Sequence, residues 1–110
     1  MALQRAVSGE VIDAAPLGSQ LGEARTTALI KTSDLEVIRL VLPRERSLPS
    51  HKVPGTITIH CIEGCVEVTH SSVTMLRPQQ MLLLDGGQPH ALRALEDSSL
   101  LVTIVLRPAR

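Results

Sequence analysis

The chain has 110 residues, and its 11 Lys and Arg balance 11 Asp and Glu, so that the formal net charge at pH 7 is zero. This length accommodates one compact domain, residues 1–110, and the lack of net charge argues against binding to nucleic acid or to an anionic membrane surface. Because the sequence contains no Phe, Tyr or Trp, aromatic stacking on bases is excluded and the core must be built from aliphatic side chains.

The first 23 residues are expected to form an N-terminal strand or arm. A helical turn fits only the stretch around residues 14–24, where Pro16, Gly18 and Gly22 argue against a longer helix. The N-terminus has no apolar run of the kind found in a secretory signal, and no run elsewhere approaches the ~20 residues of a membrane span. We therefore expect a cytoplasmic protein.

Short apolar segments follow this arm and are separated by turn sequences rich in Pro, Gly, Asp and Ser. Their apolar residues either alternate with polar ones or form β-branched runs, as is typical of β-strands. The pattern predicts eight strands, over residues 25–32, 35–42, 56–62, 66–69, 73–76, 81–84, 91–95 and 100–106. Turns that recur every ~10 residues indicate an all-β sandwich or barrel.

Two of these segments, 35–42 and 100–106, are apolar at both odd and even positions. A strand with one face in solvent alternates apolar and polar residues, so something must cover the second face of these two. The pattern predicts a homodimer in which another copy of the chain buries that face. The alternative is that loops or the N-terminal segment of the same chain cover it.

The four histidines are the main candidates for chemistry. His51 and His90 each follow a turn and lie at the mouth of a predicted strand, whereas His70 lies in a His-Ser-Ser turn and is expected to be solvated. The segment from Leu48 to Gly64 contains His51 followed by a Pro-Gly turn, and the segment from Pro78 to His90 ends in Gln-Pro-His.

In order and spacing, these two segments resemble the two sequence motifs of the cupin superfamily, of which the first reads roughly H-x-H-x3-E-x6-G and the second ends in P-H. The resemblance extends over about residues 24 to 107 and is to the small single-domain cupins, the RmlC-like conserved-barrel type. It implies a jelly-roll barrel, a double-stranded β-helix of two antiparallel sheets, that is often dimeric.

The resemblance also implies a divalent metal inside the barrel, held by side chains of the motifs. Only His51 and His90 match those ligand positions, because the second histidine of the first motif is replaced by Val53 and the carboxylate by Ile57. Fe, Mn, Ni or Zn are the metals expected, but two imidazoles fall short of the three protein ligands that such sites usually have. The other interpretation makes both histidines polar residues at the barrel mouth, hydrogen-bonded to each other, to water or to the backbone.

A third ligand has two candidates, His60 and Cys61. Strand alternation places Ile57, Ile59 and Cys61 on one face and His60 on the other, so His60 faces away from the pocket unless a bulge changes the phase. Cys61 points inward and is either a soft ligand or nucleophile or a small buried apolar residue. Strand geometry holds Cys65 too far from Cys61 for a disulfide, which predicts two reduced thiols.

Together these arguments predict a ligand pocket lined by His51, Val53, Ile57, Ile59, Cys61, Gln88 and His90. The function that requires least is the binding of a small molecule in an aliphatic barrel, with His51, His90, Gln88 and Lys52 as polar contacts and with or without a metal. The alternatives are a metal-dependent cupin enzyme of the dioxygenase, isomerase or decarboxylase kind, and a structural module whose dimer face is its function.

Overall fold

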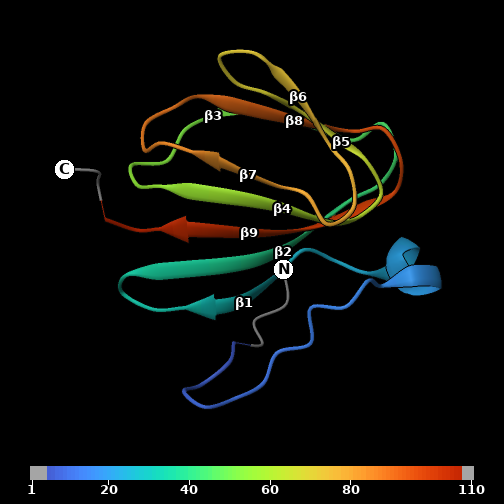
Figure 1. Ribbon diagram of the computed structural model, residues 1–110. Coiled ribbons are helices and arrows are strands. Elements are labelled where there is room, and N and C mark those ends of the chain that lie inside the picture. Colours follow the sequence, from blue (N-terminus) through green and yellow to red (C-terminus); the bar gives the residue numbers. More distant parts are fainter. Residues whose placement is uncertain (1–4, 108–110) are drawn as a thin grey trace.

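The computed structural model describes residues 5–107, which form two antiparallel β-sheets with a short 3-10 helix at one end (Figure 1). The five-stranded sheet has the strand order β1-β2-β9-β4-β7, and the four-stranded sheet has the order β3-β8-β5-β6. The chain passes from one sheet to the other several times, so the predicted all-β jelly-roll barrel is confirmed. Within the described residues, no helix has the length and hydropathy needed to span a membrane.

The helix and the strands have well-defined bounds. The helix η1 covers Gly18–Glu23, and the strands are β1 Thr27–Lys31, β2 Leu35–Leu42, β3 Ser47–His51, β4 Ile57–Glu63, β5 Val66–Thr69, β6 Val73–Leu76, β7 Met81–Leu84, β8 His90–Ala94 and β9 Ser98–Val105.

The core between the sheets is aliphatic, as the lack of Phe, Tyr and Trp predicts. Because side chains alternate along a strand, every second residue of β4, β5 and β9 points inward, and these inward residues are buried apart from the half-buried Ile104 towards the end of β9. The buried cluster consists of Leu42, Ile57, Ile59, Cys61, Val66, Val68, Leu76, Leu84, Leu92, Ala94, Leu100 and Val102.

All eight predicted strands are present, with ends that differ by at most two residues. The strand β3 was not predicted, because Leu48-Pro49-Ser50 has the composition of a turn. It is an edge strand of its sheet, and an edge position tolerates the missing N–H of Pro49. Its pairing with β8 is irregular between Leu48 and His51.

The N-terminal segment is an arm without a strand over residues 5–17, followed by η1, which is the predicted helical turn. The arm begins beside β1, where the Ala6 N–H donates to the Leu29 carbonyl at 2.8 Å. It then crosses the outer face of β2, where the Arg39 guanidinium donates to the carbonyls of Asp13 at 3.2 Å and Ala15 at 2.9 Å. Residues 1–4 of the predicted arm and residues 108–110 of the predicted domain lie outside the described part.

The arm covers part of the second face of the two-sided strands. Three outward-facing residues near it, Arg39, Val41 and Ser99, are buried, so at this end the same chain supplies the cover. Farther along β9, Leu101 is only half-buried and Val105 is 37% exposed.

Glu63, at the end of β4, fastens the arm to the barrel. Its carboxylate accepts hydrogen bonds from the backbone N–H of Leu17 at 2.8 Å and of Gly18 at 3.0 Å, and from the Ser99 hydroxyl. Burial alone would raise the pKa of Glu63, but these hydrogen bonds and the nearby Arg39 guanidinium outweigh it and lower the pKa below the ordinary 4.5. Folding therefore favours the ionised carboxylate, which contributes stability above pH 4.5 that is lost as the pH falls through the lowered pKa.

We expect Glu63→Gln to reduce the free energy of unfolding by about 1–2 kcal/mol at pH 7, because the amide keeps one acceptor oxygen but loses the charge. The difference from the wild type should shrink as the pH is lowered towards 3, where the wild-type carboxylate is also protonated. Urea unfolding followed by far-UV circular dichroism measures this without an aromatic residue. The control is Glu96→Gln, an exposed carboxylate at the same end of the barrel; an equal loss in both variants would contradict the assignment.

Candidate functional site

A cavity of about 160 Å³ lies between the two sheets. Its wall is aliphatic apart from one threonine and two histidines. The lining residues are Thr26, Ile38, Leu40, Leu48, His51, Ile57, Ile59, His90, Leu92, Val102 and Ile104. The cavity exists because inward-facing Leu, Ile and Val side chains line both walls without an aromatic ring to fill the space between them.

His51 and His90 lie together at this cavity, as the last residue of β3 and the first of β8. They are direct cross-strand partners, and their ring centroids are 4.4 Å apart with the ring planes tilted by 58°. His90 is only 2% exposed, whereas His51 is exposed to solvent. The pair therefore connects the closed interior with the surface.

Backbone carbonyls fix both rings in the same way. His51 Nδ1 lies 3.1 Å from the Pro49 carbonyl oxygen, and His90 Nδ1 lies 3.0 Å from the Gln88 carbonyl oxygen. A carbonyl oxygen only accepts hydrogen bonds, so Nδ1 of each ring carries a proton and donates. In a neutral ring this leaves Nε2 as an acceptor, and no described residue donates to it. Each ring thus offers one Nε2 acceptor at a cavity whose wall is otherwise aliphatic apart from Thr26.

The structure brings together four of the seven residues that the sequence predicts for the pocket, namely His51, Ile57, Ile59 and His90. Val53 packs against the core but lines a separate surface depression beside Lys52. Gln88 contributes its backbone carbonyl to His90 rather than a side chain to the wall.

The remaining candidates lie elsewhere. Cys61 is fully buried in the core but does not line the cavity. His60 pairs with Met81 of β7 and Leu101 of β9, and its side chain lies on the outer face of the five-stranded sheet, so it does not join the other two histidines. His70 is half-buried, with Nε2 2.8 Å from the Thr74 hydroxyl.

The candidate ligands for a metal ion number only two, fewer than the three protein ligands that such sites usually have. The tethering of Nδ1 to a carbonyl is the arrangement that metal-binding histidines commonly have. However, the described residues contain no cluster of three or more His, Cys, Asp or Glu side chains that could hold an ion. The two histidines would need ligands that the described part of the chain does not supply.

Sequence reasoning missed most of the apolar wall. Ile38 and Leu40 of β2, and Val102 and Ile104 of β9, occupy even positions of strands that are apolar on both faces. Their alternation alone does not tell which face is inside. The register of β2 and β9 against β4, whose inward face was predicted, would have identified them.

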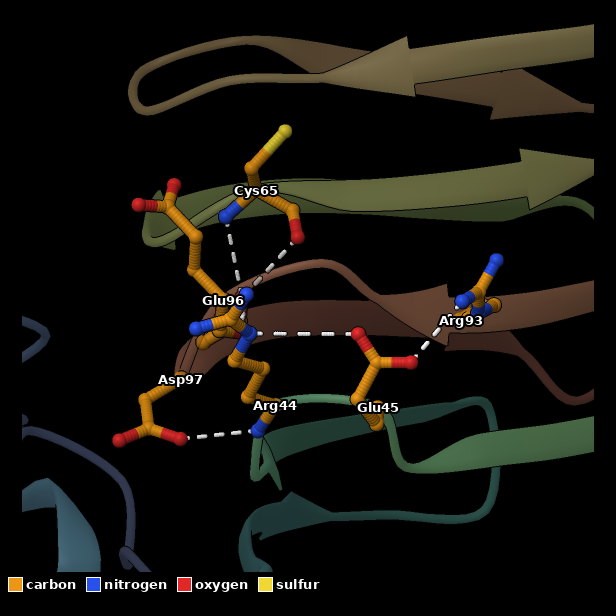
Figure 2. Close-up of polar contacts among 7 residues, drawn as sticks. Arg44, Glu45, Cys65, Arg93, Glu96 and Asp97 are labelled. Carbon is orange, nitrogen blue, oxygen red and sulfur yellow. Dashed lines mark hydrogen bonds and ion pairs between the residues drawn. The ribbon is translucent and has the colours of Figure 1, made fainter.

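A larger hollow of about 760 Å³ lies at the opposite end of the barrel, between η1 and the loops around Gly64, Pro78 and Asp97. Both Glu63 oxygens there already accept hydrogen bonds from the arm. Nearby, Figure 2 shows the Glu45 carboxylate between Arg93, at 2.9 Å, and Arg44, at 3.9 Å. This exposed network contributes little to stability because solvent screens it. The smaller and less open cavity with the histidine pair is the better candidate site.

Burial makes Cys61 a poor nucleophile. Desolvation is the main cause that raises the pKa of its thiol to about 11, and nearby Cys65 and Glu63 raise it further. The thiol therefore stays protonated near neutral pH, and the Cys61 S–H group points at the Glu63 carbonyl oxygen at 3.5 Å. These observations favour the interpretation of Cys61 as a small buried apolar residue over its interpretation as a nucleophile.

We expect iodoacetamide at pH 8 to alkylate Cys65, which is half-buried, well before Cys61. Two pKa units alone reduce the thiolate fraction of Cys61 roughly a hundredfold, and burial slows the reagent further. Intact-mass spectrometry should show one adduct on the native wild type, none on Cys65→Ser, and two on the wild type in urea. Native labelling of Cys61 as fast as that of Cys65 would contradict the burial argument.

Comparisons with known proteins support the barrel. No protein-family model matches the sequence, and no curated protein matches it. Among solved structures, a conserved Streptococcus pyogenes protein of unknown function aligns over 99% of this chain and 98% of its own, with a TM-score of 0.75 and 21% identity. A cupin superfamily protein from Desulfitobacterium hafniense aligns over 93% of this chain and 100% of its own, with a TM-score of 0.77 and 16% identity.

A more distant similarity is to the oxalate decarboxylase of Bacillus subtilis, a protein with Mn(II) centres. It covers 66% of this chain and 21% of that protein, with a TM-score of 0.61 and 18% identity. At these identities the comparisons establish the fold and leave the ligand open. The two sheets, their strand order and the agreement with solved cupins over nearly the whole length show that the chain folds as a small cupin domain.

Proposed function

We propose that the protein binds a small, largely apolar molecule in the cavity between its sheets, and that His51 and His90 recognise the polar group of that molecule. The observation that carries the proposal is the combination of an aliphatic wall with two Nε2 acceptors held in place by the Pro49 and Gln88 carbonyls. Binding pockets are typically apolar surfaces with a few fixed polar groups that orient the ligand.

The volume of the cavity limits the size of the ligand that it can hold. A cavity of about 150 Å³ with an aliphatic wall holds one benzene molecule, and the present cavity is about 160 Å³. A ligand of roughly six to eight non-hydrogen atoms therefore fits. Since neutral imidazoles with a protonated Nδ1 accept hydrogen bonds at Nε2, the polar group of the ligand should be a donor such as a hydroxyl.

A divalent metal held by the same two histidines is the second candidate. It is favoured by the carbonyl tethering of both rings and by the Mn(II) centres of the structurally similar oxalate decarboxylase. Against it stand Val53 and Ile57 at the other ligand positions, and aliphatic side chains donate no electron pair to a metal. We therefore assign the binding of a small molecule to the site. The two free thiols suit a reducing compartment such as the cytoplasm.

We expect phenol to bind at least about fivefold more tightly than benzene, because one hydrogen bond to Nε2 contributes about 1 kcal/mol or more in an apolar site. Chemical-shift titration of the ¹⁵N-labelled protein measures both affinities. In His90→Leu, benzene binding should persist while the advantage of phenol falls. The control is His60→Leu, on the outer face, which should behave as the wild type. Equal affinities for phenol and benzene in the wild type would contradict recognition by the histidines, and no binding of either would contradict the cavity as a site.

Metal titrations test the second candidate. With only two protein ligands, we expect Mn²⁺ and Zn²⁺ to bind more weakly than micromolar and the purified protein to contain far less than one metal per chain. Elemental analysis and calorimetry on the wild type, His51→Ala and His90→Ala measure this. Near-stoichiometric metal that is lost in both variants would contradict the proposal and establish a metal site.

A further inference from the structure

Thr26 is the one polar side chain, apart from the two histidines, among the described residues that line the cavity. It directly precedes β1 and is half-buried, and its neighbours in the wall are Leu, Ile and Val side chains. A hydroxyl in an apolar wall costs free energy unless it is hydrogen-bonded. The hydroxyl of Thr26 therefore needs a partner for its oxygen and another for its hydrogen.

The oxygen of this hydroxyl has its partner within the protein. Thr26 Oγ1 accepts a hydrogen bond from the Val41 N–H at 3.0 Å. The pairing of β1 with β2 begins at Thr27 and Arg39, so Val41 lies beyond the end of this pairing. The threonine side chain takes the place of the missing strand partner, and the contact fixes the oxygen beside β2.

The hydrogen of the same hydroxyl has no such partner in the part of the chain that the structure describes. A hydroxyl donates one hydrogen bond, and its hydrogen rotates towards an acceptor. The neighbouring Thr27 hydroxyl donates to the Arg25 carbonyl at 2.9 Å, whereas no described residue accepts from the Thr26 hydroxyl. A donor therefore remains available at the cavity.

Thr26 and the two histidines belong to different walls of the cavity. Thr26 is joined to the five-stranded sheet through β1 and the Val41 N–H, whereas His51 and His90 are paired in the four-stranded sheet. Figure 1 shows β1 on one side of the barrel and β3 and β8 on the other. The cavity thus has acceptors on one wall, the two Nε2 atoms, and a donor on the opposite wall.

We infer that the ligand is a small hydroxyketone, whose hydroxyl donates to a histidine Nε2 and whose carbonyl oxygen accepts from the Thr26 hydroxyl. This inference rests on the proposed function and narrows it to one class of ligand, with Thr26 as a specificity-determining residue. Because the cavity of about 160 Å³ holds a molecule of about the size of benzene, a single six-membered ring separates the two groups. Since the donor and the acceptors lie on opposite walls, the two groups lie at opposite ends of that ring.

Chemical-shift titration of the ¹⁵N-labelled protein with 4-hydroxycyclohexanone and cyclohexanol tests the inference. We expect the hydroxyketone to bind the wild type at least about fivefold more tightly, because one further hydrogen bond gives roughly that factor. In Thr26→Val the two ligands should bind equally, whereas Thr26→Ser, which keeps the hydroxyl, should keep the advantage. The matched control is Thr58→Val, on the outer face of the same sheet, which should behave as the wild type.

The outcomes separate recognition by Thr26 from a structural role. If Thr26 only supported the Val41 N–H, Thr26→Val would be less stable but would keep the preference for the hydroxyketone. That result, or equal affinities of the wild type for both ligands, would overturn the inference and leave the proposed function intact, because cyclohexanol alone tests the cavity and its histidines. Failure of both ligands to bind would overturn the inference together with the proposed function.

A second measurement uses the wild type and does not depend on the folding of Thr26→Val. A hydrogen bond to a ketone oxygen moves the carbonyl ¹³C resonance downfield. The resonance of bound 4-hydroxycyclohexanone, labelled at the carbonyl carbon, should therefore lie downfield of its position in cyclohexane. A bound resonance at the cyclohexane position would overturn the inference, since the carbonyl would then have no donor in the cavity.

Discussion

The register of β4 against β9 and β7 determines which side chains the barrel encloses. With Ile59 opposite Val102 and Leu82, the aliphatic side chains of β4 point inward and Thr58 and His60 point outward. A shift of one residue would exchange these sets and place a histidine in the core. The cavity, the position of His60 and the apolar outer face all follow from this register.

The same register separates two sets of side chains on opposite faces of one sheet. Inside, branched aliphatic residues leave a cavity that the paired His51 and His90 connect to the surface. Outside, the same register places largely uncharged side chains such as Thr58, Leu83 and Leu101. Because neighbouring residues of β9 serve the two faces in turn, both faces of this strand are apolar. The inner apolar residues of β9 are explained by the core, and the homodimer remains a prediction for the outer ones.

Much of this arrangement was predictable from the sequence. Alternation indicated eight of the nine strands and the inward face of β4, while the resemblance of the segments around His51 and His90 to the cupin motifs correctly implied the jelly-roll barrel. The strand β3 was missed because Pro49 and two serines have turn composition, and only the pairing with β8 extends that segment. The part of the cavity wall that β2 and β9 contribute depends on the register between strands, which a local sequence pattern does not reveal. The same holds for the hydrogen bond between Leu17 and the Glu63 carboxylate, because these residues are 46 positions apart in the sequence.

The proposed recognition of a ligand depends most directly on the tautomers of His51 and His90, since it requires a protonated Nδ1 and a free Nε2 in each neutral ring. Long-range ¹H–¹⁵N correlation spectra of the imidazoles at slightly alkaline pH measure this. We expect the Nδ1–H tautomer for both rings and a change of the Nε2 resonances when phenol is added, as the proposed recognition requires. Nε2–H tautomers, or Nε2 resonances that do not respond to phenol, would contradict it.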